Sequence, residues 1–222
     1  MFSGEQAGAW VRATAAVIDE NAAMLTRLDQ AIGDGDHGTN LNRGFKAVLQ
    51  RLGSAPPGDL GALFKSVSMA LIGKVGGAAG PLYGSFYLGM SRTLGDAGEV
   101  DDEGLAKALR TGLDAVIARG KAQLEDKTMV DALHPALAAL ERTLDAGGQL
   151  GEALDAAAAA AGDGMRATIP LVARKGRASY LGERSRDHQD PGATSSHLIL
   201  RTLADVVNGR GDTAPGPGTD GR

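Results

Sequence analysis

The chain of 222 residues is long enough for one large domain or two small ones with a substantial buried core. It contains no cysteine, which excludes disulfides and thiolate metal sites and fits a cytoplasmic location, and we expect no signal peptide at its start. Its net charge of −4, with both signs dispersed, gives nucleic acid no basic face, and no apolar run is long enough to span a membrane. Small molecules and other proteins are therefore the expected partners.

Apolar residues recur at helical intervals along most of the chain. Aromatic residues make up only 4% of it, and alanine is abundant, including every position of residues 156–161, which favours helix over strand. No segment shows the alternation typical of a strand, so we predict an all-α fold of about eight helices. Apolar stripes mark helices over residues 10–28, 60–71, 105–116 and 137–144, and further helices are expected over 39–52, 83–94, 150–166 and 193–207.

Four of the predicted connections are rich in glycine and polar residues, over 29–38, 73–84, 120–128 and 175–192. They alternate along the chain with plainer connections. Successive connections of an up-and-down bundle alternate between its two ends, so these four are expected at the same end. We expect the functional site there. One helical domain is predicted over residues 1–208, followed by a disordered tail over 209–222.

The first of these connections holds the most informative motif of the chain. Asp29, Asp34 and Asp36 lie close together, and the last two belong to a Gly-Asp-Gly-Asp-His-Gly turn. Three hard oxygen ligands in such a short stretch suit Mg²⁺ or Ca²⁺ better than zinc or iron. The alternative is a set of solvated turn and cap residues, because Asp and Gly favour turns in any case.

The glycines and the histidine of the same turn indicate an anion beside the cation. Gly33, Gly35 and Gly38 can take positive φ and let amide N–H groups converge on a phosphate. His37 is open to three interpretations: a surface residue, a ligand, or a hydrogen-bond donor to phosphate. Residues 38–40 are expected to open the second helix, where free N–H groups and the helix dipole favour phosphate.

The second and third polar connections carry weaker signals. Residues 73–84 form another glycine-rich loop that leads into a helix, but they lack the Gly-Lys-Ser/Thr of a Walker A loop. A close helix crossing would explain these glycines equally well. The Asp126-Lys-Thr-Met-Val-Asp131 stretch could merely cap a helix.

The segment over residues 175–192 is unusually long for a connection in a compact helical domain, which favours binding over a plain solvated loop. Arg177, Arg184 and Arg186 offer planar cations for phosphate or carboxylate. A rigid Asp-Pro-Gly turn ends the segment, and Thr194 or Ser195 is expected to cap the helix that follows.

With these segments in hand, the chain closely resembles the nucleotide-binding, DhaL-type subunit of dihydroxyacetone kinases. The resemblance covers about residues 5–208. It implies the fold of that family, an eight-helix antiparallel up-and-down barrel with the nucleotide site at one end. Five stretches carry the resemblance in family order, over residues 31–40, 76–84, 126–133, 175–184 and 188–196.

The resemblance implies that Asp29, Asp34 and Asp36 hold a pair of Mg²⁺ ions against the phosphates of ADP or ATP. The metals would neutralise phosphate oxygens and orient the γ-phosphoryl group for in-line attack, so no catalytic nucleophile is needed from this chain. The residues implied to surround the nucleotide are His37, Gly38, Thr39, Asn40, Ala78, Ala79, Gly120, Met129, Arg177, Asp190, Pro191 and Gly192.

The resemblance also implies a partner. In this family a separate subunit or domain holds the ketose covalently on its own histidine, and nothing in this sequence resembles that module. The chain would then donate a phosphoryl group to dihydroxyacetone, or a related small ketose, held by a partner subunit. A phosphotransferase-system phosphoprotein could recharge the bound ADP, or ATP could exchange freely. No nucleic acid or membrane partner is expected.

Two positions depart from the family pattern. Ala79 stands where Ser is common, which removes a hydroxyl contact to phosphate but leaves the backbone N–H. Glu125 replaces a common Gly before Asp126, which could alter loop closure or partner docking. Neither departure touches the predicted metal ligands.

Two rival functions come from different classes. The nucleotide domain of fatty-acid-kinase-like enzymes shares the Asp-Gly-Asp and glycine-rich loops, but it normally has Thr in place of His37 and is fused to a lipid-binding region. A non-catalytic nucleotide-sensing module that regulates a transcription factor fits the intact metal ligands less well. The exact sugar and the oligomeric state stay open.

Overall fold

The computed structural model describes residues 1–54 and 58–210. Within them the predicted all-α fold is confirmed, and no helix is both long and apolar enough to cross a membrane. The elements in chain order are β1 (Phe2–Ser3), α1 (Gly4–Ile32), α2 (His37–Ser54), α3 (Leu60–Lys74), α4 (Ala79–Leu94), β2 (Glu99–Val100), α5 (Asp102–Gly120), α6 (Val130–Asp145), α7 (Leu150–Ala167), the 3₁₀ helix η1 (Arg177–Ser185) and α8 (Pro191–Val207).

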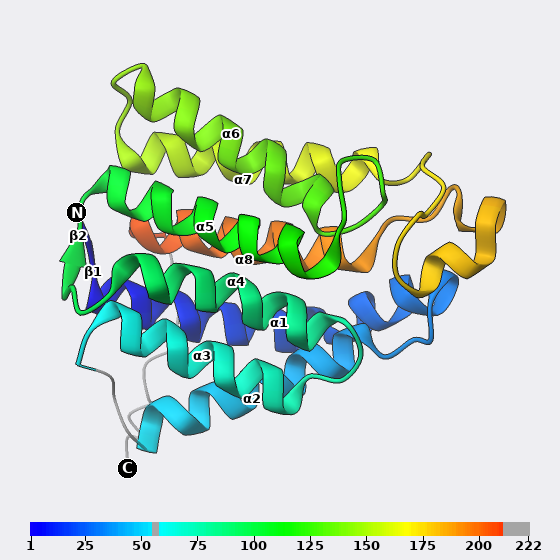
Figure 1. The fold of residues 1–222 in the computed structure, drawn as a ribbon, viewed down its shortest axis with the longest axis horizontal. Helices are drawn as coiled ribbons and strands as arrows, with labels where there is room; N and C mark the ends of the chain where they lie inside the picture. The colour runs from blue at the N-terminus through cyan, green and yellow to red at the C-terminus, as the bar shows by residue number, and fades with distance from the viewer. Residues whose placement is uncertain (55–57, 211–222) are drawn as a thin grey trace, which may run out of the picture.

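The eight α-helices close into a ring. Each helix packs against the next one in the chain, and α8 returns to pack against α1. Neighbouring helices run in alternating directions, so the barrel is antiparallel, as predicted (Figure 1). The α1–α2, α3–α4 and α5–α6 connections and the long α7–α8 connection all lie at the right-hand end in Figure 1, as the alternation requires.

The two short strands were not predicted. Phe2 pairs with Val100 and Ser3 with Glu99, so β1 and β2 form a small antiparallel ribbon at the end opposite the four polar loops (Figure 1). Each strand has two residues, which is too short for any alternation of apolar and polar residues to appear in the sequence.

Helix α1 is longer than the others. Its 29 residues span ~44 Å, and a capping box starts it: the Ser3 hydroxyl accepts from the Gln6 amide, and the Gln6 side chain accepts from the Ser3 amide. At the other end α1 continues past the ends of the neighbouring helices (Figure 1). This last stretch carries Asp29, the first of the three clustered carboxylates, to the polar loops.

The hydrophobic core contains a cluster of aromatic side chains from three helices. Trp10 of α1 lies edge-on to Phe64 of α3 at 5.7 Å between ring centroids, and Phe64 stacks on Tyr87 of α4 at 6.0 Å. The indole N–H of Trp10 donates to the Ile199 carbonyl of α8 at 3.0 Å. Trp10 therefore joins the first helix of the ring to the last.

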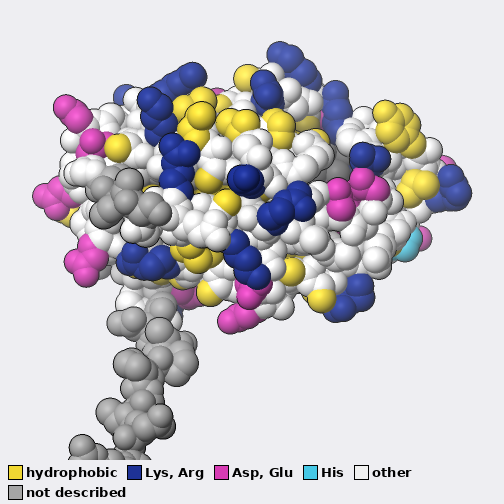
Figure 2. Space-filling view, turned by 90° about the horizontal axis from the view of Figure 1, so that it is seen from below, with side chains coloured by type: hydrophobic (Ala, Val, Ile, Leu, Met, Phe, Trp, Pro, Cys, Tyr) yellow, Lys and Arg dark blue, Asp and Glu magenta, His cyan; other side chains and the backbone are white. Residues whose placement is uncertain are grey.

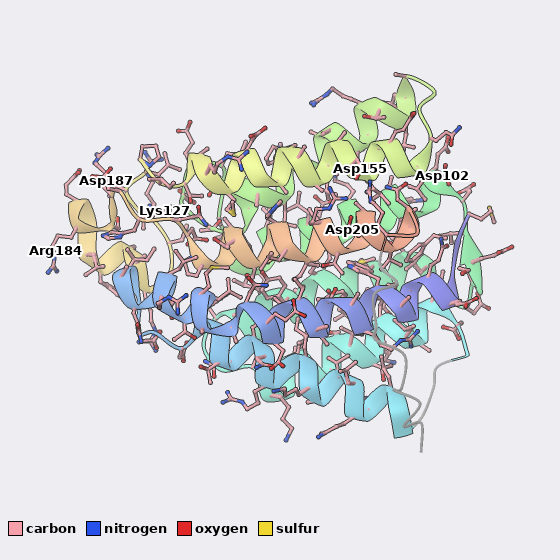
Figure 3. The ribbon with its side chains drawn as sticks, turned by 180° about the vertical axis from the view of Figure 1, so that it is seen from behind. Asp102, Lys127, Asp155, Arg184, Asp187 and Asp205 are labelled. Atoms are coloured by element: carbon pink, nitrogen blue, oxygen red, sulfur yellow. The ribbon has the colours of Figure 1, made fainter. Side chains whose placement is uncertain are left out.

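Ion pairs fasten α7 to α8 at the end away from the polar loops (Figure 3). The Arg201 guanidinium lies 2.8 Å from an Asp155 oxygen and 2.7 Å from an Asp205 oxygen. Arg210 also pairs with both carboxylates. The predicted disordered tail over 209–222 lies outside the described residues from 211 onward.

Two glycines of α3 give a test of how tightly the helices pack. A Cβ added at Gly61 would lie 2.1 Å from the Gly95 carbonyl oxygen, whereas one at Gly73 meets nothing within 4 Å. We expect Gly61→Ala to lower the free energy of unfolding by about 1–3 kcal/mol because backbone must shift. Gly73→Ala, the matched control, should raise it by up to about 1 kcal/mol through helix propensity. Urea unfolding measures both, and equal effects would contradict the close crossing.

Candidate functional site

A cleft of about 700 Å³ opens at the end of the barrel that carries the polar loops. Its walls come from the α1–α2, α3–α4 and α5–α6 loops, the η1 segment and the start of α8. Near the right-hand end of the face in Figure 2, which is the same end, acidic side chains lie directly beside basic ones. The expectation that the four segments meet at one site is therefore correct.

The three predicted carboxylates come together on one side of this cleft. Asp29, Asp34 and Asp36 each offer an oxygen, and these oxygens lie within 4.8 Å of one another. The Oδ2 atom of Asp29 accepts the backbone amides of Asp36 at 2.8 Å and His37 at 3.1 Å. These bonds fold the loop back onto the last turn of α1, so Asp29 both organises the cluster and belongs to it.

The glycines of this loop have different roles. Only Gly35 has a positive φ, of 73°, whereas Gly33 has a φ of −144°, so the sequence argument for positive φ fails at Gly33. Gly38 lies inside α2, and an added Cβ would lie 2.0 Å from the Ala22 carbonyl oxygen of α1. Gly38 therefore lets two helices cross closely.

The His37 side chain takes part in a hydrogen-bond chain beneath the cleft. Its Nε2 lies 2.9 Å from the Ser195 hydroxyl, which lies 2.6 Å from the Tyr83 hydroxyl. Tyr83 in turn lies 3.0 Å from the Ser196 hydroxyl. Burial lowers the pKa of His37, although the nearby Asp29 and Asp36 carboxylates act to raise it. Burial also raises the pKa of Tyr83 to about 12. These hydrogen bonds connect the first turns of α2, α4 and α8.

The glycine-rich loop delivers the start of α4 to the cleft. Gly77 has a φ of 64°, and the N-cap residue Ala78 makes no side-chain capping hydrogen bond. The first amides of α4 are therefore not satisfied by a side-chain cap, and a helix start of this kind attracts anions. Both Ala78 and Ala79 line the cleft.

The long α7–α8 segment contains the 3₁₀ helix η1, which was not predicted. The Arg177 guanidinium lies 3.0 Å from an Asp34 oxygen, so this segment reaches across to the carboxylate cluster. Arg186 instead pairs with Glu183 at 2.9 Å, and Arg184 lies at the outer edge of the segment (Figure 3). Of the three arginines singled out in the sequence, only Arg177 lines the cleft.

Asp190 begins the last helix. Its carboxylate accepts the Ala193 amide at 2.7 Å, so Asp190 is the N-cap and α8 starts at Pro191. The prediction that Thr194 or Ser195 caps this helix is wrong, because both are buried inside it. Burial raises the pKa of Asp190 to about 7, and the nearby Asp131 carboxylate adds to this shift.

Most residues predicted for the site line the cleft. Gly38 and Thr39 do not line it, and Thr39 is exposed, with its hydroxyl 3.5 Å from that of Thr26. Several lining residues were not predicted individually, although Leu82, Tyr83, Lys127 and Val130 lie in stretches that carry the family resemblance. The cleft is lined by the predicted Asp29, Asp34, Asp36, His37, Asn40, Ala78, Ala79, Gly120, Met129, Arg177, Asp190, Pro191 and Gly192, and by the unpredicted Ile32, Leu82, Tyr83, Val116, Lys127 and Val130.

Comparisons with known proteins identify the family of this chain. The model of the DAK2 domain matches residues 31–205. The chain belongs to the DAK2 domain family. It is 41% identical over 195 residues to the ADP-binding subunit DhaL of the PEP-dependent dihydroxyacetone kinase of Escherichia coli (strain K12), which covers 88% of this chain and 93% of that one. It is 42% identical over 190 residues to the ADP-binding subunit DhaL of the PTS-dependent dihydroxyacetone kinase of Lactococcus lactis, with 86% and 91% covered.

A solved structure agrees with this assignment. The dihydroxyacetone kinase from C. freundii in complex with AMP-PNP and Mg²⁺ matches with a TM-score of 0.69 and 28% identity. The match covers 90% of this chain and 33% of that one, so this chain spans about a third of that kinase. The resemblance to DhaL-type subunits that the sequence indicated is confirmed.

The buried Asp190 makes the stability of this DAK2 domain depend on pH. Its pKa is about 7 in the folded chain against an ordinary 3.8, so folding favours the protonated form. The stabilisation is complete below about pH 4 and is lost as pH rises to about 7. Between pH 5 and pH 7, Asp190→Asn should gain on the order of 2 kcal/mol relative to the wild type, because Asn keeps the cap and cannot ionise.

Thermal unfolding of nucleotide-free protein at pH 5, 6, 7 and 8 measures this difference. Asp96→Asn, an exposed position at the opposite end, is the control and should follow the wild type at every pH. Parallel curves for Asp190→Asn and the wild type would show that Asp190 titrates normally.

Glu125 has a φ of 67°, in the region that favours glycine. A residue with a Cβ is strained there and glycine is not. We expect Glu125→Gly to raise the free energy of unfolding by about 0.5–1 kcal/mol. Glu20→Gly, the same change within helix α1, should lower it by about 1 kcal/mol. Urea unfolding of the two variants checks both, and a loss of stability in Glu125→Gly would contradict the strain.

Proposed function

We propose that this chain binds ADP or ATP with Mg²⁺ and donates a phosphoryl group to dihydroxyacetone, or a related small ketose, held by a partner subunit. The observation that carries the proposal is the meeting of three carboxylates and an uncapped helix start in one cleft. The first arrangement suits a hard cation and the second suits phosphate. The family membership and the Mg²⁺–AMP-PNP complex of the C. freundii kinase support the same assignment.

The carboxylate cluster fits Mg²⁺. Its donor atoms are oxygens, and the Asp29 Oδ2 that accepts two amides leaves Oδ1 without a hydrogen bond from the described residues. Asp29, Asp34 and Asp36 would hold the metal, with two ions as the finer expectation. Bound there, Mg²⁺ would neutralise phosphate oxygens and align the transferred group.

The remaining polar groups of the cleft suit the phosphates. The Arg177 guanidinium lies at the carboxylate cluster, where it would add positive charge next to the metal ligands. The first amides of α4 would donate to phosphate oxygens, so Ala79 needs no hydroxyl for this role. The His37 amide donates to Asp29 and its side chain lies against the Ser195 hydroxyl, so His37 would support the phosphate site by holding the carboxylate loop in place.

An apolar wall suits the adenine base. Leu82, Val116, Met129 and Val130 line the cleft from α4, α5 and the start of α6. Gly120 ends α5 beside them, where a Cβ would lie 3.1 Å from a Leu82 methyl carbon. Flat apolar surfaces are what a base needs for burial. Asp190, Pro191 and Gly192 would complete the pocket at the start of α8.

The phosphoryl acceptor would come from outside this chain. In-line transfer needs only a positioned donor, metal and acceptor, and the proposal assigns donor and metal to this cleft. The partner would be a ketose-binding kinase subunit. A phosphotransferase-system phosphoprotein would recharge ADP in one mode, and free ATP would replace ADP in the other. A cytoplasmic location stays a prediction.

Neutralising one carboxylate tests the proposal. Asp34→Asn removes a hard, charged ligand and should weaken Mg²⁺-dependent ADP binding by at least about 100-fold, since even an outer-shell partner contributes about 10–100-fold. The helical circular dichroism should stay unchanged, because Asp34 lies in an exposed loop. Calorimetric titration with ADP, with and without Mg²⁺, measures the loss. Asp96→Asn is the control and should bind as the wild type does.

The nucleotide content of freshly purified protein separates the two modes. Stoichiometric ADP that leaves only after EDTA would support ADP as a resident cofactor. An empty protein that binds ATP would support exchange. No nucleotide binding by the wild type at any Mg²⁺ concentration would falsify the proposed function.

A further inference from the structure

One lysine of the cleft wall is almost completely buried, and the proposed function does not use it. Lys127 is 1% exposed, whereas a lysine normally keeps its ammonium group in water. Burial lowers the pKa of this ammonium, and the nearby carboxylates of Asp190, Asp187 and Asp131 raise it. A buried cation persists only where polar atoms replace its water shell, so the groups around Lys127 define its role.

The Lys127 ammonium lies within hydrogen-bond distance of four main-chain carbonyl oxygens, to which its three N–H groups donate. Those of Thr168, Leu171 and Ile169 lie at 2.7, 3.1 and 3.3 Å, and the fourth belongs to His188. Three of these carbonyls directly follow α7, and the fourth precedes α8. One charged group therefore joins the two ends of the loop over residues 168–190, which we call the α7–α8 loop. In Figure 3 Lys127 lies at this end of the barrel, between α7 and the outer part of that loop.

Four more hydrogen bonds join the two ends of this loop, which form its neck. The Asp187 amide donates to the Ile169 carbonyl at 2.8 Å, and the Asp190 amide donates to the Thr168 hydroxyl at 3.0 Å. The Arg186 guanidinium donates to the Pro170 carbonyl at 2.9 Å, and the Ala173 amide donates to the Ser185 hydroxyl at 2.9 Å. Loops whose ends are held together in this way move as compact units. Unlike these groups, the ammonium comes from another connection, the α5–α6 loop, so it also fixes where the unit sits.

The α5–α6 loop is held in a strained conformation that presents Lys127. Lys121, Glu125 and Lys127 have φ values of 54°, 67° and 62°, in the region that favours glycine. Such conformations persist where surrounding contacts enforce them. The Asp131 carboxylate accepts the amides of Glu125 and, at 2.7 Å, of Thr128, which braces the loop on both sides of the lysine.

The loop that Lys127 closes forms one wall of the cleft. Residues 174–180 line it, and Arg177 reaches the Asp34 carboxylate at 3.0 Å. The first of these residues, Arg174, also donates its amide to the Asp126 carbonyl at 3.0 Å, next to Lys127. This wall is therefore continuous with the neck and is also bonded to the α5–α6 loop beside Lys127.

We propose that Lys127 is a positioning residue that closes the neck of the α7–α8 loop and thereby sets how slowly nucleotide leaves the cleft. The proposal rests on the proposed nucleotide binding and adds a control on residence time. It assigns to the ammonium a part in deciding whether ADP stays between turnovers or exchanges. Lys127 acts on the nucleotide through the loop that it holds.

The absence of cysteine from the chain allows a closely matched test. Lys127→Cys is alkylated in denaturant with 2-bromoethylamine, which rebuilds an ammonium on a side chain of nearly the original length. A second sample is alkylated with 1-bromopropane, which gives a neutral side chain with the same number of heavy atoms. Both samples are refolded. Release of labelled ADP into excess unlabelled ADP with Mg²⁺, and hydrogen exchange of nucleotide-free protein, are then measured.

We expect the aminoethylated protein to release ADP within about threefold of the wild-type rate, and the propylated protein to release it at least about tenfold faster, the change that removal of one hydrogen-bonded charge produces. Hydrogen exchange should rise in residues 171–188 of the propylated protein and stay unchanged in α7 near Leu150. Gly61→Ala is destabilised far from the loop and should release ADP at the wild-type rate. Equal ADP release from the two alkylated proteins would overturn the proposal.

Two further results keep the test decisive. If the propylated protein does not refold, Lys127→Gln, which keeps a polar but neutral donor, takes its place, and ADP release at the wild-type rate from this variant overturns the proposal. If the wild type binds no ADP, the proposed function fails and the residence-time role fails with it. Hydrogen exchange then shows separately whether Lys127 closes the neck.

Discussion

The closure of the helical ring is the constraint on which the rest of this structure depends. Eight helices that alternate in direction place every second connection at the same end, and the return of α8 to α1 brings the last of these connections beside the first. The bond from the Trp10 indole to the Ile199 carbonyl is one specific contact of this closure. Without the closure of the ring, the carboxylate loop and the Asp190 turn would belong to separate parts of the molecule.

Two charged groups of the cleft are held by groups from a different connection. Arg177 of the α7–α8 loop lies against Asp34 of the α1–α2 loop, and Lys127 of the α5–α6 loop holds the carbonyls of Thr168 and His188. Around the buried Lys127 ammonium, low local dielectric strengthens these hydrogen bonds and makes the loss of an acceptor costly. The cleft therefore depends on the relative placement of its loops, which the rigid barrel provides.

The helices and the carboxylate cluster could be predicted from the sequence, because their signals are local. Spacing of about 3.6 residues reports a buried helix face, and three Asp residues in a short turn report a ligand set. The inward turn of Lys127 could not be predicted, because its acceptors lie 41 or more positions away and lysine is normally exposed. The α8 cap was misassigned because Asp190, Thr194 and Ser195 are all good cap residues, and only the path of the backbone selects Asp190.

The extra length of α1 has a consequence for how a second macromolecule could reach the site. Because α1 continues past the ends of the neighbouring α-helices, the stretch that carries Asp29 lies beyond them, beside the η1 segment (Figure 1). A group bound at Asp29, Asp34 and Asp36 would then lie near this end of the molecule, next to η1, while an apolar base would rest deeper between α4, α5 and α6. Under the proposed function, the reacting end of the donor is accessible from outside with no need for the barrel to open. A docking partner then has to match only this end of the molecule, including the η1 segment.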